Sequence, residues 1–134
     1  SIDGSTGLLE SSGAKIDEEV FGTSGVLENT HPGSRDLLLG KTPTPALEAA
    51  HSPHRNVPAD APPFFLLHAE DDEVVPVNNA LLLRAALKDK RVRVETHLFE
   101  HGGHGFGLRK AIGKPVEAWP ELWRAWARTT GLAL

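Results

Sequence analysis

The apolar run from Phe64 to Ala69 constrains the fold of this chain more than any other segment. It has the length of a β-strand, shows no alternation of polar and apolar residues, and is followed directly by the acidic residues 70–73. Such a run is typical of a strand that is buried on both faces of a parallel sheet. Because helices must then cover both faces, the segment predicts an α/β fold.

The two segments that follow complete this expectation. Pro76 precedes residues 77–88, which carry apolar residues at helical spacing, so the sequence predicts a helix there. Residues 91–99 alternate between valine, threonine or leucine on one face and mostly polar side chains on the other, which indicates a strand nearer the sheet edge. Together these segments predict a βαβ unit. A final helix over residues 120–129 has an apolar stripe that we assign to the core: Leu122, Trp123, Trp126 and Ala127.

The first half of the chain gives weaker signals. Residues 1–30 are rich in glycine, serine, threonine and acids, and we interpret them as a loop-rich segment with at most a short helix around residues 17–21. Repeated prolines interrupt the stretch up to residue 63, within which residues 34–40 and 44–50 are each predicted as a short helix. The predicted organisation is therefore a segment 1–30 followed by a domain over 31–134.

Composition narrows the class of protein. The 134 residues suit one domain, and 40 % hydrophobic with 24 % charged residues is ordinary for a soluble globular protein. A net charge of −4 argues against nucleic acid as a partner, and no apolar stretch is long enough to cross a membrane. Without cysteine there is neither a disulfide nor a thiolate zinc site. The chain shows no signal peptide and contains no methionine, so a cytoplasmic and a secreted location both stay open.

Two residues at the ends of the predicted strands point to a catalytic function. Asp72 follows the first strand, and His104 lies in a glycine-rich loop after the second. Parallel strands connected by one helix bring these ends to the same edge of the sheet, so we expect the Asp72 carboxylate to meet a ring nitrogen of His104, with Asp71 pointing elsewhere. An acid that holds the histidine tautomer and a histidine that acts as general base are two members of a Ser-His-Asp triad.

Other interpretations of the same residues stay open. Asp72 could instead cap the helix that begins near Pro76, as could Asp71 or Glu73. His104 could be a turn histidine.

A metal site is a further alternative, in which His97, His101 and His104 would be the ligands. It is the weaker hypothesis, because His97 lies on a predicted strand and His101 on a loop, whereas the familiar His-x-x-x-His pair needs a helix to bring both rings to one face.

Four segments, residues 31–43, 62–72, 74–79 and 99–108, together carry a resemblance to a known family. With the motifs HAEDDEVVP and HGGHGFG, they resemble the C-terminal half of α/β-hydrolase esterases of the acetyl-xylan-esterase and feruloyl-esterase-like group. The resemblance implies the C-terminal portion of a three-layer sandwich with a mostly parallel sheet. It also implies a serine esterase that acts on small acyl groups, often acetyl, on sugars or xylan, without a cofactor. In the family spacing the triad acid falls on Asp72 and the base on His104.

The chain departs from this family in one respect. The sequence contains no Gly-x-Ser-x-Gly nucleophile elbow; the nearest segment, around Ser24, has valine in place of the last glycine. Residues 101–103 imitate an oxyanion loop, but such a loop precedes the nucleophile. We therefore expect the chain to supply the acid and base, to be inactive alone, and to need a missing N-terminal part or a second chain.

Two rival functions stay open at this point: a non-catalytic fragment or interaction module, and a metal-dependent hydrolase. The expected partners are a small ester substrate and, through unpaired apolar surface, a further copy of the chain.

Overall fold

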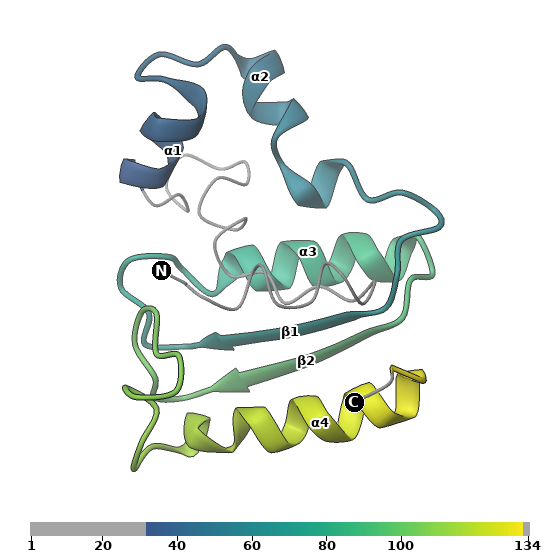
Figure 1. Cartoon of the computed structure of the whole chain (residues 1–134). Coiled ribbons are helices and arrows are strands. Elements are labelled where there is room, and N and C mark those ends of the chain that lie inside the picture. Colours follow the sequence, from purple (N-terminus) through teal and green to yellow (C-terminus); the bar gives the residue numbers. More distant parts are fainter. Residues whose placement is uncertain (1–31, 133–134) are drawn as a thin grey trace.

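The computed structural model describes residues 32–132, drawn in colour in Figure 1. The loop-rich segment predicted for residues 1–30, including the short helix around 17–21 and Ser24, lies outside the described residues. Within them, the elements follow in the order of two short helices, a strand, a helix, a strand and a final helix, so the predicted α/β organisation is confirmed.

Two parallel strands form the sheet of the described part. β1 (Phe64–Ala69) pairs with β2 (Val94–Phe99) in a register that runs from Phe64 opposite Val94 to Ala69 opposite Phe99. The second strand thus begins later than the predicted residue 91. Arg91 has a left-handed backbone with φ of 59°, and the amide of Val92 donates to the carbonyl of Leu87 at 2.9 Å, so the chain is still turning out of the helix there.

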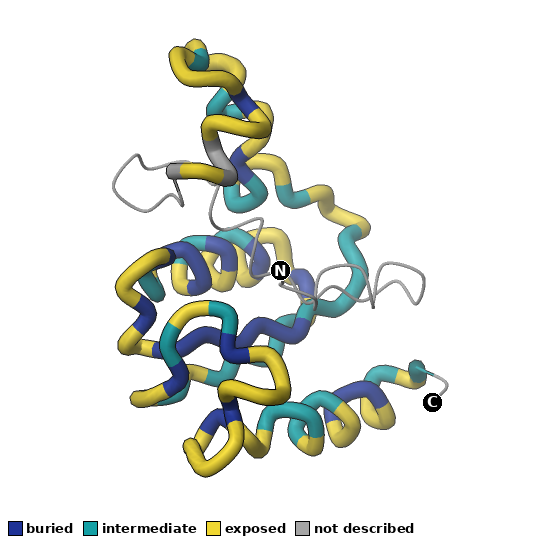
Figure 2. Tube along the Cα trace, turned by 60° about the vertical axis from the view of Figure 1, so that its left-hand side comes forward, coloured by how far each residue is buried: buried dark blue, intermediate teal, exposed yellow. Residues whose placement is uncertain are grey.

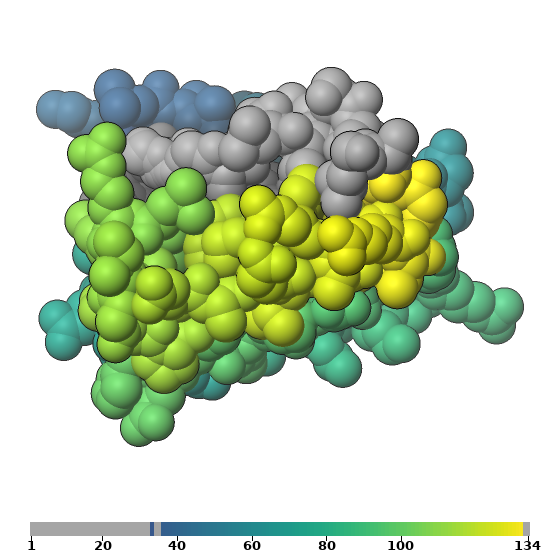
Figure 3. Space-filling view, turned by 60° about the horizontal axis from the view of Figure 1, so that its bottom comes forward, coloured from purple at the N-terminus to yellow at the C-terminus, as the bar shows by residue number. Residues whose placement is uncertain are grey.

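Helices cover both faces of this sheet and make three layers (Figure 1). α3 (Asn78–Asp89) packs on one face, where Leu66 joins Leu83 and Leu87 in a buried cluster. α4 (Trp119–Thr130) packs on the other face, where the second buried cluster has as members Phe65, Leu67, Ala69, Phe106, Ala111, Val116, Trp126 and Ala127. Figure 3 shows α4 and the segment before it forming the surface of that side. The predicted burial of the first strand on both faces is confirmed.

The segment before the sheet is helical and packs against α3 (Figure 2). It consists of α1 (Pro32–Leu39), α2 (Pro45–Ala50) and the 3₁₀ turn η4 (Pro53–Arg55), while a second such turn, η5 (Pro115–Ala118), leads into α4. The predicted end of α1 is confirmed, since Gly40, with φ of +81°, follows it, but the helix begins at Pro32, two residues earlier than predicted. The predicted cap of α2 is also confirmed, because the Thr44 hydroxyl accepts a hydrogen bond from the amide of Leu47 at 3.2 Å. No helix of the described residues is long and apolar enough to span a membrane.

Candidate active site

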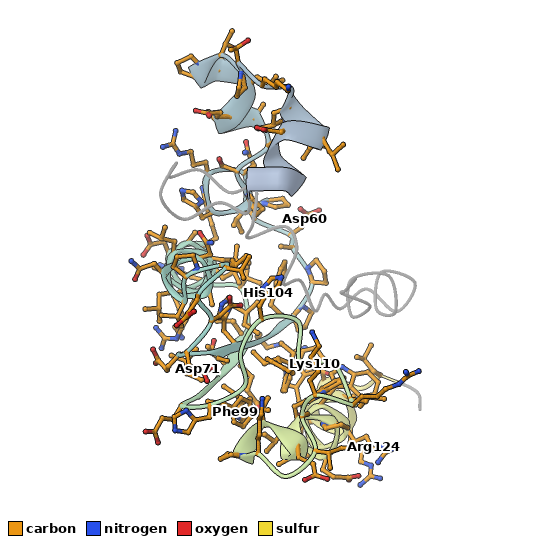
Figure 4. The ribbon with its side chains drawn as sticks, turned by 90° about the vertical axis from the view of Figure 1, so that its left-hand side faces the viewer. Asp60, Asp71, Phe99, His104, Lys110 and Arg124 are labelled. Atoms are coloured by element: carbon orange, nitrogen blue, oxygen red, sulfur yellow. The ribbon has the colours of Figure 1, made fainter. Side chains whose placement is uncertain are left out.

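The loops that leave β1 and β2 lie together at the carboxyl ends of the strands. Figure 1 shows both arrowheads pointing to the same side, and Figure 4 looks onto that side, with Asp71, His104 and Lys110 labelled. In open α/β sheets this edge is where ligands bind, because loops from successive strands converge there.

Asp72 is a buried residue in the otherwise mostly exposed turn directly after β1. Its side chain is 1 % exposed, and Oδ1 accepts the backbone amides of Val74 and Val75, each at 2.8 Å. Since α3 begins only at Asn78 and its cap position is Val77, the alternative in which Asp72 caps this helix is wrong. The two amides instead hold the carboxylate so that its other oxygen points out of the turn.

That second oxygen meets the histidine. Oδ2 of Asp72 lies 3.0 Å from Nδ1 of His104, whose side chain is 38 % exposed. The predicted contact between these two residues is confirmed. A carboxylate only accepts hydrogen bonds, so Nδ1 carries the proton and Nε2 of the neutral ring carries the lone pair that a general base requires.

Asp71 contacts the backbone directly before His104, whereas Asp72 contacts the ring, which is the division of roles expected. Oδ1 of Asp71 accepts the backbone amides of Gly102 at 2.8 Å and Gly103 at 2.7 Å. These amides, first that of Gly103 and then that of Gly102, together with the nearby His101, hold the pKa of the Asp71 carboxyl below its ordinary value of 3.8. Because both amides donate to Asp71, they are not directed at a substrate oxygen, which removes the apparent oxyanion loop at residues 101–103 from consideration.

The three histidines of the metal alternative are engaged with different carboxylates. His97 Nε2 lies 2.7 Å from Oε1 of Glu95, and His101 Nδ1 lies 3.5 Å from Oδ2 of Asp71. His104 contacts Asp72 instead. Among residues 32–132 no group of three or more histidine, aspartate or glutamate side chains is arranged to hold a metal ion. The structure therefore does not bring these histidines together as one ligand set.

One contact of the Asp72 carboxylate was not anticipated from the sequence. His68, which is fully buried in β1, donates from Nε2 to the carbonyl of Val75 at 2.8 Å, and the same nitrogen lies 3.5 Å from Oδ2 of Asp72. The imidazole thus supports the turn on which Asp72 sits. The sequence signal that could have indicated this contact is a polar residue, His68, inside an apolar strand and four positions before Asp72.

A buried acid that contacts an exposed imidazole at the carboxyl ends of parallel strands is the arrangement typical of α/β hydrolases. Comparison with known proteins agrees, since residues 41–125 match the prolyl oligopeptidase family, and the chain belongs to that family.

Relatives and solved structures add detail. The fold is similar to an acetyl ester-xyloside bifunctional hydrolase from Caldicellulosiruptor lactoaceticus, with a TM-score of 0.78 and 37 % identity over 88 % of this chain and 42 % of that one. The sequence is 37 % identical to endo-1,4-beta-xylanase B of Butyrivibrio fibrisolvens over 57 % of this chain and 12 % of the relative. It is 47 % identical to esterase LipQ of Mycobacterium tuberculosis over 51 % of this chain and 16 % of the relative.

The chain spans less than half the length of each of these proteins. The esterase resemblance seen in the sequence is confirmed at the level of family, fold and hydrolase class.

Proposed function

We propose that this chain carries the acid and the base of a serine carboxyl-ester hydrolase. His104 is the general base that takes the proton from a serine hydroxyl and later delivers it to the leaving alcohol, and Asp72 orients the ring and stabilises the imidazolium. The observation that carries the proposal is the 3.0 Å contact between Nδ1 of His104 and the buried, doubly hydrogen-bonded carboxylate of Asp72.

The proposed substrates are esters of small acyl groups, with acetyl groups on sugars or xylan as the first class to test. This part of the proposal draws on the relatives, which include an acetyl ester-xyloside hydrolase, a xylanase and an esterase. No cofactor is needed, since the nucleophile, base and acid of such a reaction are all side chains.

The serine nucleophile and the oxyanion donors are proposed to lie on residues that are not in this sequence. No Gly-x-Ser-x-Gly segment is present, and Ser24 lacks the second glycine that a strained nucleophile turn requires. A base and its orienting acid have no hydroxyl to activate until such a segment packs against the same sheet edge.

The test compares p-nitrophenyl acetate hydrolysis by the 134-residue chain with that by its His104→Ala variant. We expect the chain to be no faster than the variant, because a base and its orienting acid have no serine to activate. The variant serves as the reference in place of buffer, since imidazole side chains hydrolyse this activated ester slowly by themselves. Addition of a polypeptide with the Gly-x-Ser-x-Gly half, fused ahead of this chain or supplied separately, should create saturable turnover that His104→Ala abolishes and His101→Ala leaves intact. Saturable turnover by this chain alone, lost in Ser24→Ala, would contradict the proposal, and turnover that depends on a metal found by elemental analysis would favour the metal-dependent rival.

A further inference from the structure

Two adjacent carboxylates hold the His104 loop, each through a different set of atoms. Asp72 contacts the imidazole, whereas Oδ1 of Asp71 accepts the amides of Gly102 and Gly103 at 2.8 and 2.7 Å. Asp71 thus reaches across 31 and 32 residues of sequence to two successive peptide groups directly before the histidine. Neither the family match nor the triad pattern assigns Asp71 a role.

We propose that Asp71 is a positioning residue for His104, which rests on the proposed function of His104 as the general base. Its carboxylate fixes the backbone of residues 102–103 so that the next side chain meets Asp72. Asp71 is not offered as a catalytic residue, because it contacts the loop and not the reacting atoms.

The loop needs such an anchor because of its glycines. Gly103 and Gly105 flank His104 with φ of +71° and +57°. Apart from their own chain neighbours, no residue lies within 4 Å of the position that a Cβ would take at either glycine. Glycines in open space have many accessible backbone conformations, so packing does not select this one. Two hydrogen bonds to one charged oxygen restrict both peptide planes, and hydrogen bonds to ionised acceptors are stronger than neutral ones.

Neighbouring contacts define the other side of the anchor. Gly102 is buried against Ala69, and its carbonyl accepts Nζ of Lys114 at 3.2 Å. Gly102 is therefore held by two hydrogen bonds, one from its amide to Asp71 and one from Lys114 to its carbonyl. The amide of Gly103 donates its hydrogen bond to Asp71. We therefore expect loss of Asp71 to free the peptide nearest to His104 while the buried end of the loop stays in place.

The amides hold the pKa of Asp71 below its ordinary value, so the ionised form that accepts them is present at neutral pH. Asp71 does not serve as a helix cap, because α3 begins at Asn78. The side chain is 41 % exposed, and its role must therefore be measured at the loop itself and not from global stability alone.

The experiment uses the 134-residue chain, for which neither substrate nor nucleophile is needed. Amide hydrogen exchange at Gly102 and Gly103, and the ¹⁵N and proton signals of the His104 ring, are compared in Asp71→Ala, Asp71→Asn and the exposed neighbour control Glu73→Ala. Asp71→Ala should accelerate exchange at Gly103 by about tenfold or more and broaden the Nδ1 proton signal of His104. Asp71→Asn keeps an acceptor oxygen in the same place, so it should restore most of both signals, and Glu73→Ala should resemble the wild type.

Unchanged Gly103 exchange and an unchanged His104 ring signal in a cooperatively folded Asp71→Ala would overturn the proposal. If that variant does not fold, Asp71→Glu replaces it: positioning predicts that the longer carboxylate disturbs the His104 signal more than Asn does, and the reverse order would overturn it.

The reconstituted hydrolase gives a second readout, in which Asp71→Ala should lower kcat by about 10-fold to 100-fold at nearly constant KM. Failure to obtain any turnover would count against the proposed function, whereas the exchange and ring signals test Asp71 independently of it.

Discussion

Oδ2 of Asp72 and Nδ1 of His104 lie 3.0 Å apart although 32 residues separate them in sequence. One crossover, β1 through α3 to β2, brings the two loops together, and the parallel pairing of Ala69 with Phe99 places the strand ends side by side. The contact therefore depends on the register of the sheet as well as on the two loops.

The first prediction concerns this contact in the complete hydrolase. His104→Ala should lower kcat by about 10⁴ or more, since the nucleophile loses its base. Asp72→Ala should cost somewhat less, because it mainly misorients the base. Asp72→Asn separates the effect on folding from the effect on chemistry. The Asn oxygen can still accept hydrogen bonds from the Val74 and Val75 amides, so the turn should be kept. The Asn NH₂ group, however, favours the His104 tautomer with the proton on Nε2, so kcat should still fall by about 10⁴. Steady-state kinetics and ¹⁵N NMR of the ring measure the two effects, and near-normal kcat in Asp72→Asn would contradict the assigned role.

Gly102 should tolerate no side chain. A Cβ at this position would lie 2.8 Å from Cβ of Ala69 and 3.2 Å from Cδ1 of Phe106, so Gly102→Ala should destabilise the fold by about 1–3 kcal/mol. The matched control is Gly103→Asn, at a position with open space and a left-handed backbone that asparagine adopts more readily than most residues. Urea unfolding should show a smaller loss for the control; equal losses would mean that close packing at Gly102 is not the cause.

Phe65 should dominate the core on the α4 side. It is fully buried, and its ring centroid lies 5.4 Å from that of Trp126 and 5.2 Å from that of His97. Phe65→Ala should cost about 3–5 kcal/mol of unfolding free energy, and Phe65→Leu clearly less. Leu108→Ala, at a side chain 64 % exposed, should stay within about 0.5 kcal/mol and serves as the control in the same denaturation series.

Acid should weaken the anchor formed by Asp71. Because the folded-state pKa of this carboxyl lies below its ordinary value of 3.8, its stabilising effect is present at pH above that value and is lost as the pH falls through the lower folded pKa. Titratable side chains beside this anchor include His101, which contacts Asp71, Glu100, which contacts His101, and Lys114, which donates to the Gly102 carbonyl. The difference in Tm between wild type and Asp71→Asn should be present at pH 5 and shrink below pH 4. A difference that grows as the solution is acidified through this range would contradict the assigned direction.

The chain by itself should self-associate. Among the described residues β1 has a paired strand on one edge only, and Leu37 and Leu38 of α1 are 92 % and 56 % exposed. Light scattering across a dilution series should detect species larger than the monomer, and the double variant Leu37→Asp, Leu38→Asp should reduce them if α1 contributes. A monomer at all concentrations that melts cooperatively would contradict this expectation.

Local signals in the sequence determined most of the elements. An unbroken apolar run predicted β1, threonine before proline predicted the start of α2, and a tryptophan-rich stripe predicted the buried side of α4, because these depend on residue periodicity and on turn chemistry within a few positions. The same signals put an acid and a histidine at neighbouring strand ends.

Only the tertiary structure decided how the neighbouring acids divide their roles. Asp71 and Asp72 are equivalent as loop carboxylates in the sequence, and the family spacing alone favoured Asp72. In the fold, the amides of Val74 and Val75 turn the Asp72 carboxylate toward His104, while the approach of Gly102 to Ala69 brings two amides within reach of Asp71. The late start of β2 was also decided by the tertiary structure, because it depends on the turn that leaves α3. The buried contact of His68 depends on the carbonyl of Val75. Periodicity within one segment describes neither group.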